Sequence, residues 1–356
     1  MSFGQGSAFS VGIEEELLLV DPETHGLVHE AERVLPRMGV GEQRAGFEAF
    51  AAELELRSAP RTTPAEAAAE LRELRATARG AGATLLGMGV HPTAEHGDVR
   101  ITDSERYRKV DDTMRGLIRR TPECALHVHV GMPDERAAVR AHNALRCLLP
   151  LLQGLAANSP FWFGTDSGLA SARYALTRAY PRRGVPRPLR DMDEWQEVTT
   201  AAVAAGGLDD YTSLWWDVRP QPRLGTVEVR EMDVQADVEG SAALAALVQS
   251  VAARAAERPQ RDAPPSEALN ESSFRAARDG LAAEILHEGR VLPLAEAARA
   301  TVEDCRAVAR SLGSEDALAG VERILTEGCG ADRRRAAFGR GRMPEVLREA
   351  VAETVS

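Results

Sequence analysis

The chain has 356 residues, of which 44% are hydrophobic and 27% are charged, and its formal net charge at pH 7 is −11. This composition predicts a globular protein that buries a sizeable core. It argues against nucleic-acid binding, which needs clustered basic surface, and no apolar run reaches the roughly 18 residues of a membrane span.

The basic residues are almost all arginine, with Lys109 as the one lysine. Lys109 lies in no glycine-rich sequence, which excludes a lysine-dependent phosphate-binding loop, and a GxGxxG turn is absent as well. The four cysteines are widely spaced and form no CxxC motif, which indicates reduced thiols, and the first residues do not resemble a signal peptide. We therefore expect a cytoplasmic protein.

Alternating apolar residues predict strands, and apolar stripes bounded by capping residues or prolines predict helices. The predicted elements, in chain order, are a strand over 11–20, a short return strand over 27–30 that completes a hairpin, a strand region over 46–58, a helix over 64–80, a strand over 83–90, a helix over 104–119, a strand over 123–132, helices over 133–155 and 165–178, a loop over 181–188, a helix over 192–205, and strands over 214–218 and 226–234. Thr63 is the predicted N-cap of the helix over 64–80.

After residue 237 the strand signals cease. Helices are predicted over 237–257, 271–288, 293–312, 314–327 and 344–354, with an exposed loop over 258–265. This layout predicts an α+β fold in which a mixed sheet core, residues 1–236, carries a C-terminal helical layer, residues 237–356. We assign the whole chain, residues 1–356, to a single catalytic domain.

Four of the predicted strands each carry two polar residues at positions i and i+2 of an otherwise apolar run. These pairs are Glu14–Glu16, Glu55–Arg57, His127–His129 and Glu228–Arg230. Successive side chains of a strand point to opposite faces, so each pair lies on one face of its strand. Four such strands in one sheet would gather carboxylates, imidazoles and guanidiniums into a patch that suits metal ions and phosphate.

Each pair alone also fits a simpler structure. The acidic triplet 14–16 would suit an exposed edge strand, but the apolar run Leu17–Val20 indicates a central strand, where unpaired charges are costly. The alternation in Glu53–Arg57 would suit a half-exposed strand with a surface ion pair. Two histidines on one face of an apolar strand are harder to explain by packing alone.

With these pairs in place, the chain resembles the carboxylate–amine ligase family, also called glutamate–cysteine ligase type 2. The resemblance is carried, in the family's order, by the segments VGIEEELLLVDPETHGLV, AELELRSAP, GVHP, ALHVHVGMPD, LAANSPFWFGTDSGLASAR, LWWDVRPQPRLGTVEVREMD and EGCGADRRRAAFGRG. It implies a glutamine-synthetase-like fold, in which an antiparallel sheet forms a funnel with helices packed on its outside. It also implies an ATP-dependent reaction with Mg²⁺ or Mn²⁺ that joins a carboxylate to an amine, by default glutamate to cysteine, through an acyl phosphate.

The resemblance also assigns roles to individual residues. The implied metal ligands are Glu14, Glu16, Glu55, His129 and Glu228. The residues implied to bind the nucleotide are His127, Arg219 and Arg230. The residues implied to act in catalysis are Arg57, Arg173 and Arg230, of which the first two would orient the carboxylate substrate and the third would stabilise the transferring phosphoryl group. Glu231 stands where the family usually has an apolar residue.

Two alternatives stay open at this point. The His-x-His pair beside carboxylates would also suit a metal-dependent amidohydrolase, although only His142 and His287 follow His129 and both lie in predicted helices. The other alternative is a non-catalytic family member that binds a nucleotide or an amino acid. The expected partners are small-molecule carboxylate and amine substrates, whose identity the sequence does not give, and an exposed helical layer would suit a homodimer.

Overall fold

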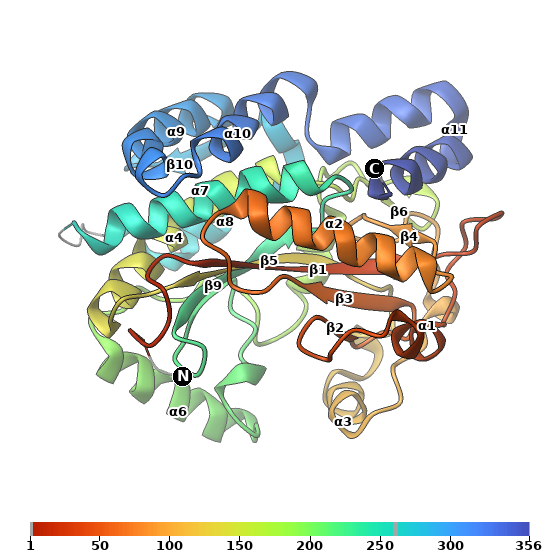
Figure 1. The fold of residues 1–356 in the computed structure, drawn as a ribbon, viewed down its shortest axis with the longest axis horizontal. Helices are drawn as coiled ribbons and strands as arrows, with labels where there is room; N and C mark the ends of the chain where they lie inside the picture. Colours follow the sequence, from red (N-terminus) through yellow and green to blue (C-terminus); the bar gives the residue numbers. More distant parts are fainter. Residues whose placement is uncertain (1–2, 259–262, 356) are drawn as a thin grey trace.

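The fold is built around a large antiparallel sheet (Figure 1). The structure is a computed structural model that describes residues 3–258 and 263–355. Within these residues, seven strands pair in the order β2-β3-β1-β5-β9-β8, with β4 beside the end of β1. The strands are β1 (Val11–Leu19), β2 (Ala45–Phe47), β3 (Glu53–Arg57), β4 (Leu85–Leu86), β5 (Ala125–Gly131), β8 (Val218–Gln221) and β9 (Thr226–Asp233).

The strand β1 lies in the centre of the sheet, with β3 on one side and β5 on the other. The apolar residues Leu17, Leu18 and Leu19 are fully buried, which confirms that this strand is central rather than an edge strand. The strands predicted over 123–132 and 226–234 are confirmed as β5 and β9. The region predicted over 46–58 consists of two strands, β2 and β3, which pair with each other.

Four strand predictions differ from the structure. The return strand over 27–30 is reduced to a single bridge between Val20 and Leu27, because the chain enters helix α1 at Ala31. Only β4 remains of the strand predicted over 83–90, and β8 begins at Val218, where the predicted strand ended. The sheet is antiparallel rather than mixed, because the helices between its strands do not form parallel βαβ units.

Helices cover one face of the sheet. The helices α2, α4 and α7 pack against its strands, α8, α9 and α10 pack on α4 or α7, and α3 and α6 lie on the other side of the sheet (Figure 1). The helices are α1 (Ala31–Met38), α2 (Pro64–Gly80), α3 (Glu105–Met114), α4 (Glu135–Leu155), α5 (Ala172–Thr177), α6 (Met192–Gly206), α7 (Val238–Ala256), α8 (Ser266–Asp279), α9 (Leu294–Ser311), α10 (Glu315–Glu327) and α11 (Gly330–Thr354), with short 3₁₀ turns at His96–Asp98, Arg115–Leu117, Tyr211–Ser213 and Gly280–Ala282.

The helix α7 connects the sheet to the outer helices. It is rich in alanine and leucine on all sides and is buried along most of its length, as expected for a helix enclosed by other elements. Asp237 caps its N-terminus, because its carboxylate accepts a hydrogen bond from the Gly240 amide at 2.7 Å. The same carboxylate pairs with Arg323 of α10 at 2.8 Å and with Arg333 of α11 at 3.2 Å.

Helix predictions succeed where capping signals are clear. The helix α2 covers the predicted range, and Thr63 and Glu66 form a capping box at its start, with backbone-to-side-chain distances of 3.1 and 3.3 Å. The helix predicted over 165–178 is wrong in its first part, where a small hairpin, β6 (Phe161–Trp162) and β7 (Thr165–Asp166), precedes α5. Gly164 and Gly168 adopt φ values of 73° and 77°, which end regular helix there.

The C-terminal part also contains strands, which the sequence analysis did not predict. The helix predicted over 271–288 is confirmed up to Asp279, within α8, and is wrong beyond it, because a hairpin follows, β10 (Glu284–His287) and β11 (Arg290–Pro293). Gly280, with φ of 57°, ends the helix. The last helix, α11, begins at Gly330 rather than near residue 344 and contains a kink at Gly341–Arg342.

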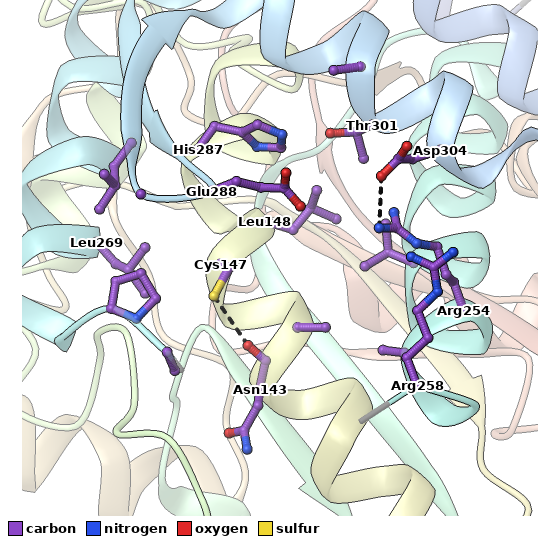
Figure 2. A pocket seen from close by; sticks show the side chains of 18 of the residues that line it. Asn143, Cys147, Leu148, Arg254, Arg258, Leu269, His287, Glu288, Thr301 and Asp304 are labelled. Atoms are coloured by element: carbon purple, nitrogen blue, oxygen red, sulfur yellow. Dashed lines mark hydrogen bonds and ion pairs between the residues drawn. The ribbon is translucent and has the colours of Figure 1, made fainter. Parts of the chain in front are cut away.

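A cavity of about 490 Å³ lies within the helical layer, between α4, α7, α8, α9 and the β10–β11 turn (Figure 2). Asn143, Cys147, Arg254 and Asp304 are among the residues that line it, and Arg254 pairs with Asp304 at 2.8 Å. The site residues predicted from the sequence do not line this cavity.

No helix in the described residues combines the length and the apolarity needed to cross a membrane. Part of the loop predicted over 258–265, residues 259–262, lies outside the described residues. The assignment of the whole chain to a single catalytic domain stays a prediction.

Candidate active site

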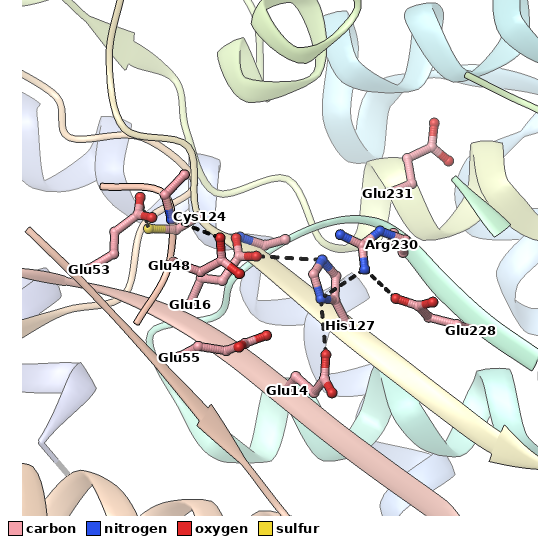
Figure 3. Close-up of polar contacts among 12 residues, drawn as sticks. Glu14, Glu16, Glu48, Glu53, Glu55, Cys124, His127, Glu228, Arg230 and Glu231 are labelled. Carbon is pink, nitrogen blue, oxygen red and sulfur yellow. Dashed lines mark hydrogen bonds and ion pairs between the residues drawn. The ribbon is translucent and has the colours of Figure 1, made fainter. Parts of the chain in front are cut away.

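The four polar pairs predicted from the sequence lie on four neighbouring strands, β3, β1, β5 and β9. In the register of the sheet, Glu14 is opposite both Arg57 and His127, and Glu16 is opposite Glu55. His129 is opposite Glu228, which is itself opposite Arg219 on β8. The pairs therefore meet on one face of the sheet, and Figure 3 shows Glu14, Glu16 and His127 on this face. Glu15, which points to the opposite face, contacts Arg75 of α2 and Ser241 of α7, so these two helices cover the other face.

Imidazoles alternate with carboxylates across this face. His127 lies 3.3 Å from Glu14 and 3.7 Å from Glu16, measured between ring nitrogen and carboxylate oxygen. His129 lies 3.6 Å from Glu14 and 3.8 Å from Glu228. Figure 3 shows His127 at the centre, between Glu16, Glu14 and Arg230. The carboxylates of separate strands thus face a common region.

Three overlapping groups of these residues could each hold a metal ion among the described residues. Within each group, one ligand atom per residue lies within 4.8 Å of the others. The groups are Glu14–Glu55–His127, Glu14–His129–Glu228, and Glu16–Glu48–Glu55. Every metal ligand predicted from the sequence belongs to at least one group, and His127, predicted to contact the nucleotide, belongs to one as well.

Glu48 belongs to this constellation and was missed in the sequence. If residues 46–58 formed one continuous strand, Glu48 would point away from Glu55, because an odd number of positions separates them. The chain instead reverses between β2 and β3, which returns Glu48 to the same side. Glu48 could have been predicted only by recognising this reversal in the sequence.

One end of the site, the acidic end, contains Glu16, Glu48 and Glu53 and has more carboxylates than cations to neutralise them. Burial and the neighbouring carboxylate of Glu48 raise the pKa of Glu16 to about 7. Burial, together with Glu16 and Glu48, raises the pKa of Glu53 well above its ordinary value, and the Cys124 thiol donates to Glu53 at 3.2 Å. Crowded carboxylate oxygens with few cations beside them are the donor set that hard divalent cations such as Mg²⁺ and Mn²⁺ prefer. The residues present therefore fit such an ion.

The other end of the site is paired with arginine. Burial raises the pKa of Glu228, but Arg219, Arg230 and His129 outweigh it and hold the pKa well below its ordinary range. Arg219 donates to Glu228 at 2.7 Å, and Arg230 pairs with the other carboxylate oxygen. Gln221 also donates to Glu228, at 2.6 Å.

The pKa values of the two histidines shift in opposite directions. Burial and the guanidinium of Arg230 lower the pKa of His127 to about 3, so its imidazole is neutral at pH 7. Burial also lowers the pKa of His129, but Glu14 and Glu228 outweigh this effect and raise the pKa above its ordinary value. A neutral imidazole can accept a hydrogen bond or bind a metal ion through its free nitrogen.

The predicted arginines lie at different places. Arg57 is at the β3 edge, where it pairs with Glu55 and donates to the Glu42 carbonyl at 2.9 Å. Arg173, on α5, is buried and donates through Nη1 to the Glu231 carbonyl at 2.9 Å. Its Nε atom has no hydrogen-bond partner among the described residues. Arg219 also donates to the carbonyls of Thr212 and Leu214, at 2.8 and 2.6 Å, so its guanidinium is fully engaged by the protein.

Comparison with known proteins relates the chain to one family. The family model described as glutamate-cysteine ligase family 2 matches residues 10–355. A curated relative from Rubrobacter xylanophilus, named "Putative glutamate–cysteine ligase 2-3", is 42% identical over 347 residues, which cover 95% of this chain and 94% of the relative.

Two solved structures share the fold. A glutamate–cysteine ligase from Francisella tularensis, solved in complex with AMP, superposes with a TM-score of 0.72 at 14% identity and covers 100% of this chain and 90% of its own. The prokaryotic ubiquitin-like protein ligase PafA, solved with its protein Pup, gives a TM-score of 0.52 at 12% identity, over 98% of this chain and 79% of its own. At these identities the likeness concerns the fold, and the predicted α+β fold of glutamine-synthetase-like ligases is confirmed.

Proposed function

The chain belongs to glutamate–cysteine ligase family 2 and is an ATP-dependent carbon–nitrogen ligase, and we propose that it joins a small carboxylate to an amine through an acyl phosphate. Glutamate and cysteine are the default pair. The observation that supports this proposal is the convergence of Glu14, Glu16, Glu55 and Glu228 from three strands on one sheet face. Membership in this family disfavours the amidohydrolase alternative. The glutamates that could hold a metal ion argue against the non-catalytic family member.

In the proposed reaction, an oxygen of the substrate carboxylate attacks the γ-phosphorus of ATP, and the bond to ADP breaks. The amine nitrogen then attacks the acyl carbon, phosphate leaves, and the nitrogen loses a proton. Glu14, Glu16, Glu55, His129 and Glu228 are the residues that would hold Mg²⁺ or Mn²⁺. Such an ion supplies positive charge that offsets the charge of the phosphates.

The arginines have distinct proposed roles. Arg230 stabilises the transferring phosphoryl group, since its guanidinium lies between His127 and Glu228. Arg57 and Arg173 orient the carboxylate substrate, and the unpaired Nε of Arg173 is a donor for that purpose. Arg219 keeps Glu228 oriented, because its own donors are taken by Glu228 and two carbonyls. The predicted cytoplasmic location, the homodimer and the absence of nucleic-acid binding stay predictions.

The test is ADP release with Mg²⁺ or Mn²⁺, screened over amino acids singly and in pairs. With any accepted pair, Glu55→Gln and Arg230→Ala should each lower turnover about 100-fold, because each removes a contact to the charge of the reacting phosphates. Glu32→Gln and Arg79→Ala, both exposed on helices, are matched controls. Wild-type turnover in both site variants would contradict the assignment.

A further inference from the structure

The strand β9 contains an extra residue where it carries Arg230. Val128 of β5 pairs with Val229, and Leu126 pairs with Met232, so β5 advances by two residues while β9 advances by three. This mismatch is a β-bulge at Arg230–Glu231. Such a bulge interrupts the ladder of hydrogen bonds and changes the direction of the side chains it carries. The bulge thus lies at the residue proposed to stabilise the phosphoryl group.

The polar backbone groups of the bulge bond to other parts of the protein. The Arg230 amide donates to the Asp217 carbonyl at 2.8 Å. The Arg230 carbonyl accepts a hydrogen bond from Arg183 Nη2 at 3.0 Å, and the Glu231 carbonyl accepts one from Arg173 Nη1 at 2.9 Å. Two arginine side chains therefore satisfy the two carbonyls of the bulge.

Arg183 is itself held by Asp217. Its Nε lies 3.3 Å from the Asp217 carboxylate, and the Asp217 amide donates to the Gly184 carbonyl at 3.0 Å. Asp217 is buried and Arg183 nearly so, with 1% and 9% of their side chains exposed. Burial and the neighbouring Arg173 lower the pKa of Arg183 to about 10, so it stays charged at pH 7. A buried charge needs such partners to be tolerated.

We propose that Arg183, oriented by Asp217, is a positioning residue that fixes the bulge and so aims the Arg230 guanidinium at the reacting phosphoryl group. Arg183 acts through the Arg230 backbone and does not touch the substrate. This inference rests on the proposed function of Arg230. It adds to the site a residue from the loop between α5 and α6, where the sequence analysis predicted only a loop over 181–188.

The test is a double-mutant cycle of Arg183→Met with Arg230→Ala. Arg183→Met keeps a long side chain but removes the donor to the bulge. It should lower kcat about 10- to 100-fold, as a small misplacement of a reacting group does, with KM for ATP changed less than about threefold. In the Arg230→Ala background, the same change should lower kcat less than about threefold, because the group that it aims is already absent.

The matched control is Arg182→Met. Arg182 lies beside Arg183 in the same loop, but its guanidinium lies 5.3 Å from the centre of the Trp215 ring, and among the described residues it pairs with neither Asp217 nor a bulge carbonyl. It should keep kcat within about threefold of wild type. If Arg183→Met does not fold, Arg183→Lys replaces it in the cycle, since lysine keeps the charge but has a single nitrogen in place of the planar fork whose Nε and Nη2 meet Asp217 and the carbonyl separately.

Wild-type kcat in the Arg183 variant, or an equal loss in both Arg230 backgrounds, would overturn the inference. A wild-type protein that releases no ADP with any substrate pair would instead refute the proposed function. In that case crystal structures of the wild type and the Arg183 variant decide the positioning role. A reoriented peptide at 230–231 with a displaced Arg230 side chain supports it, and an unchanged bulge overturns it.

Discussion

The two faces of strand β1 carry neighbouring glutamates that differ in whether the chain itself neutralises their charge. Glu15 points to the face that the helices cover, whereas Glu14 and Glu16 point to the candidate active site. All three residues are identical in chemistry and consecutive in the chain. The comparison therefore separates the effect of the surroundings from the effect of the side chain.

On the helical face, the charge of Glu15 is fully matched within the chain. Arg75 of α2 pairs with it at 2.8 Å, and Ser241 of α7 donates to it at 2.7 Å. The remaining donors of Arg75 bond to the carbonyls of Gln235, Ala236 and Thr354. This buried ion pair joins the sheet to α2, α7 and the end of α11.

On the site face, the carboxylates outnumber their partners at the acidic end. Glu16 faces Glu48 and Glu55 within one group that could hold a cation, and burial with Glu48 raises its pKa to about 7. Crowded acids destabilise a protein unless something from outside neutralises them. The helical face thus serves the stability of the fold, and the site face is arranged for ligands that the chain itself does not supply.

The largest effect is expected from Glu15→Gln. This change leaves the buried Arg75 charge without its partner, which typically costs about 3–5 kcal/mol of unfolding free energy. Denaturant unfolding measures the loss, and turnover per folded molecule should stay at the wild-type level. A variant as stable as wild type would show that the pair does not hold the two layers together.

The substitution at the adjacent residue, Glu16→Gln, should lower turnover and leave the stability of the fold intact. Removing this carboxylate should lower turnover about 100-fold, equivalent to about 3 kcal/mol, because one contact to the ion and the phosphates is lost. Its melting temperature in metal-free buffer should equal or exceed that of wild type, because a repulsive charge is gone. Loss of stability with unchanged turnover would place Glu16 among the structural residues instead.

A smaller effect is expected in the pH dependence of stability, at Asp237 in the helical layer. Burial raises the pKa of Asp237, but its bond to Arg323 and the charge of Arg333 outweigh this and keep the pKa below its ordinary value. A carboxylate with a depressed pKa stabilises the fold above its unfolded value, near 3.8, and that contribution disappears as the pH falls through the folded pKa. Asp237→Asn keeps an N-cap oxygen and should cost about 1 kcal/mol at pH 7.

The cost of Asp237→Asn should begin to shrink near pH 4, where the carboxylate of the unfolded wild-type chain takes up a proton, and should disappear at the lower pH where the folded protein is protonated as well. Urea unfolding of both proteins across this range measures it. Glu231, in the bulge of β9, has the opposite tendency, because burial and Asp217 raise its pKa to about 8. A pH-independent difference in stability between the wild type and the Asp237→Asn variant would show that the ion pairs with α10 and α11 contribute nothing.

The sequence allowed the site face to be predicted because side chains alternate strictly along a strand. The i, i+2 spacing at Glu14, His127 and Glu228 was enough to place each pair on one face, and the apolar run after Glu16 indicated the central strand. The spacing did not give the order of the strands in the sheet, which the structure shows. The structure then brought these pairs together on neighbouring strands.

Features that break the alternation could not be predicted in this way. Glu48 joins the site through a reversal between two short strands, and the bulge at Arg230 adds a residue that the spacing does not reveal. The strand β10 was predicted as the end of a helix, and most of β11 was assigned to no element, because the apolar residues of this hairpin are few and its turn is short. Such features depend on contacts between distant parts of the chain, which local sequence patterns do not record.

The most direct test of the central claim is anomalous diffraction from crystals soaked with Mn²⁺ and ADP. The account predicts manganese peaks on the site face of the sheet, bound by oxygens of Glu14, Glu16, Glu55 or Glu228, and no peak at the ion pair of Glu15 and Arg75. Peaks elsewhere, or a site face that stays without manganese at saturating concentration, would contradict it.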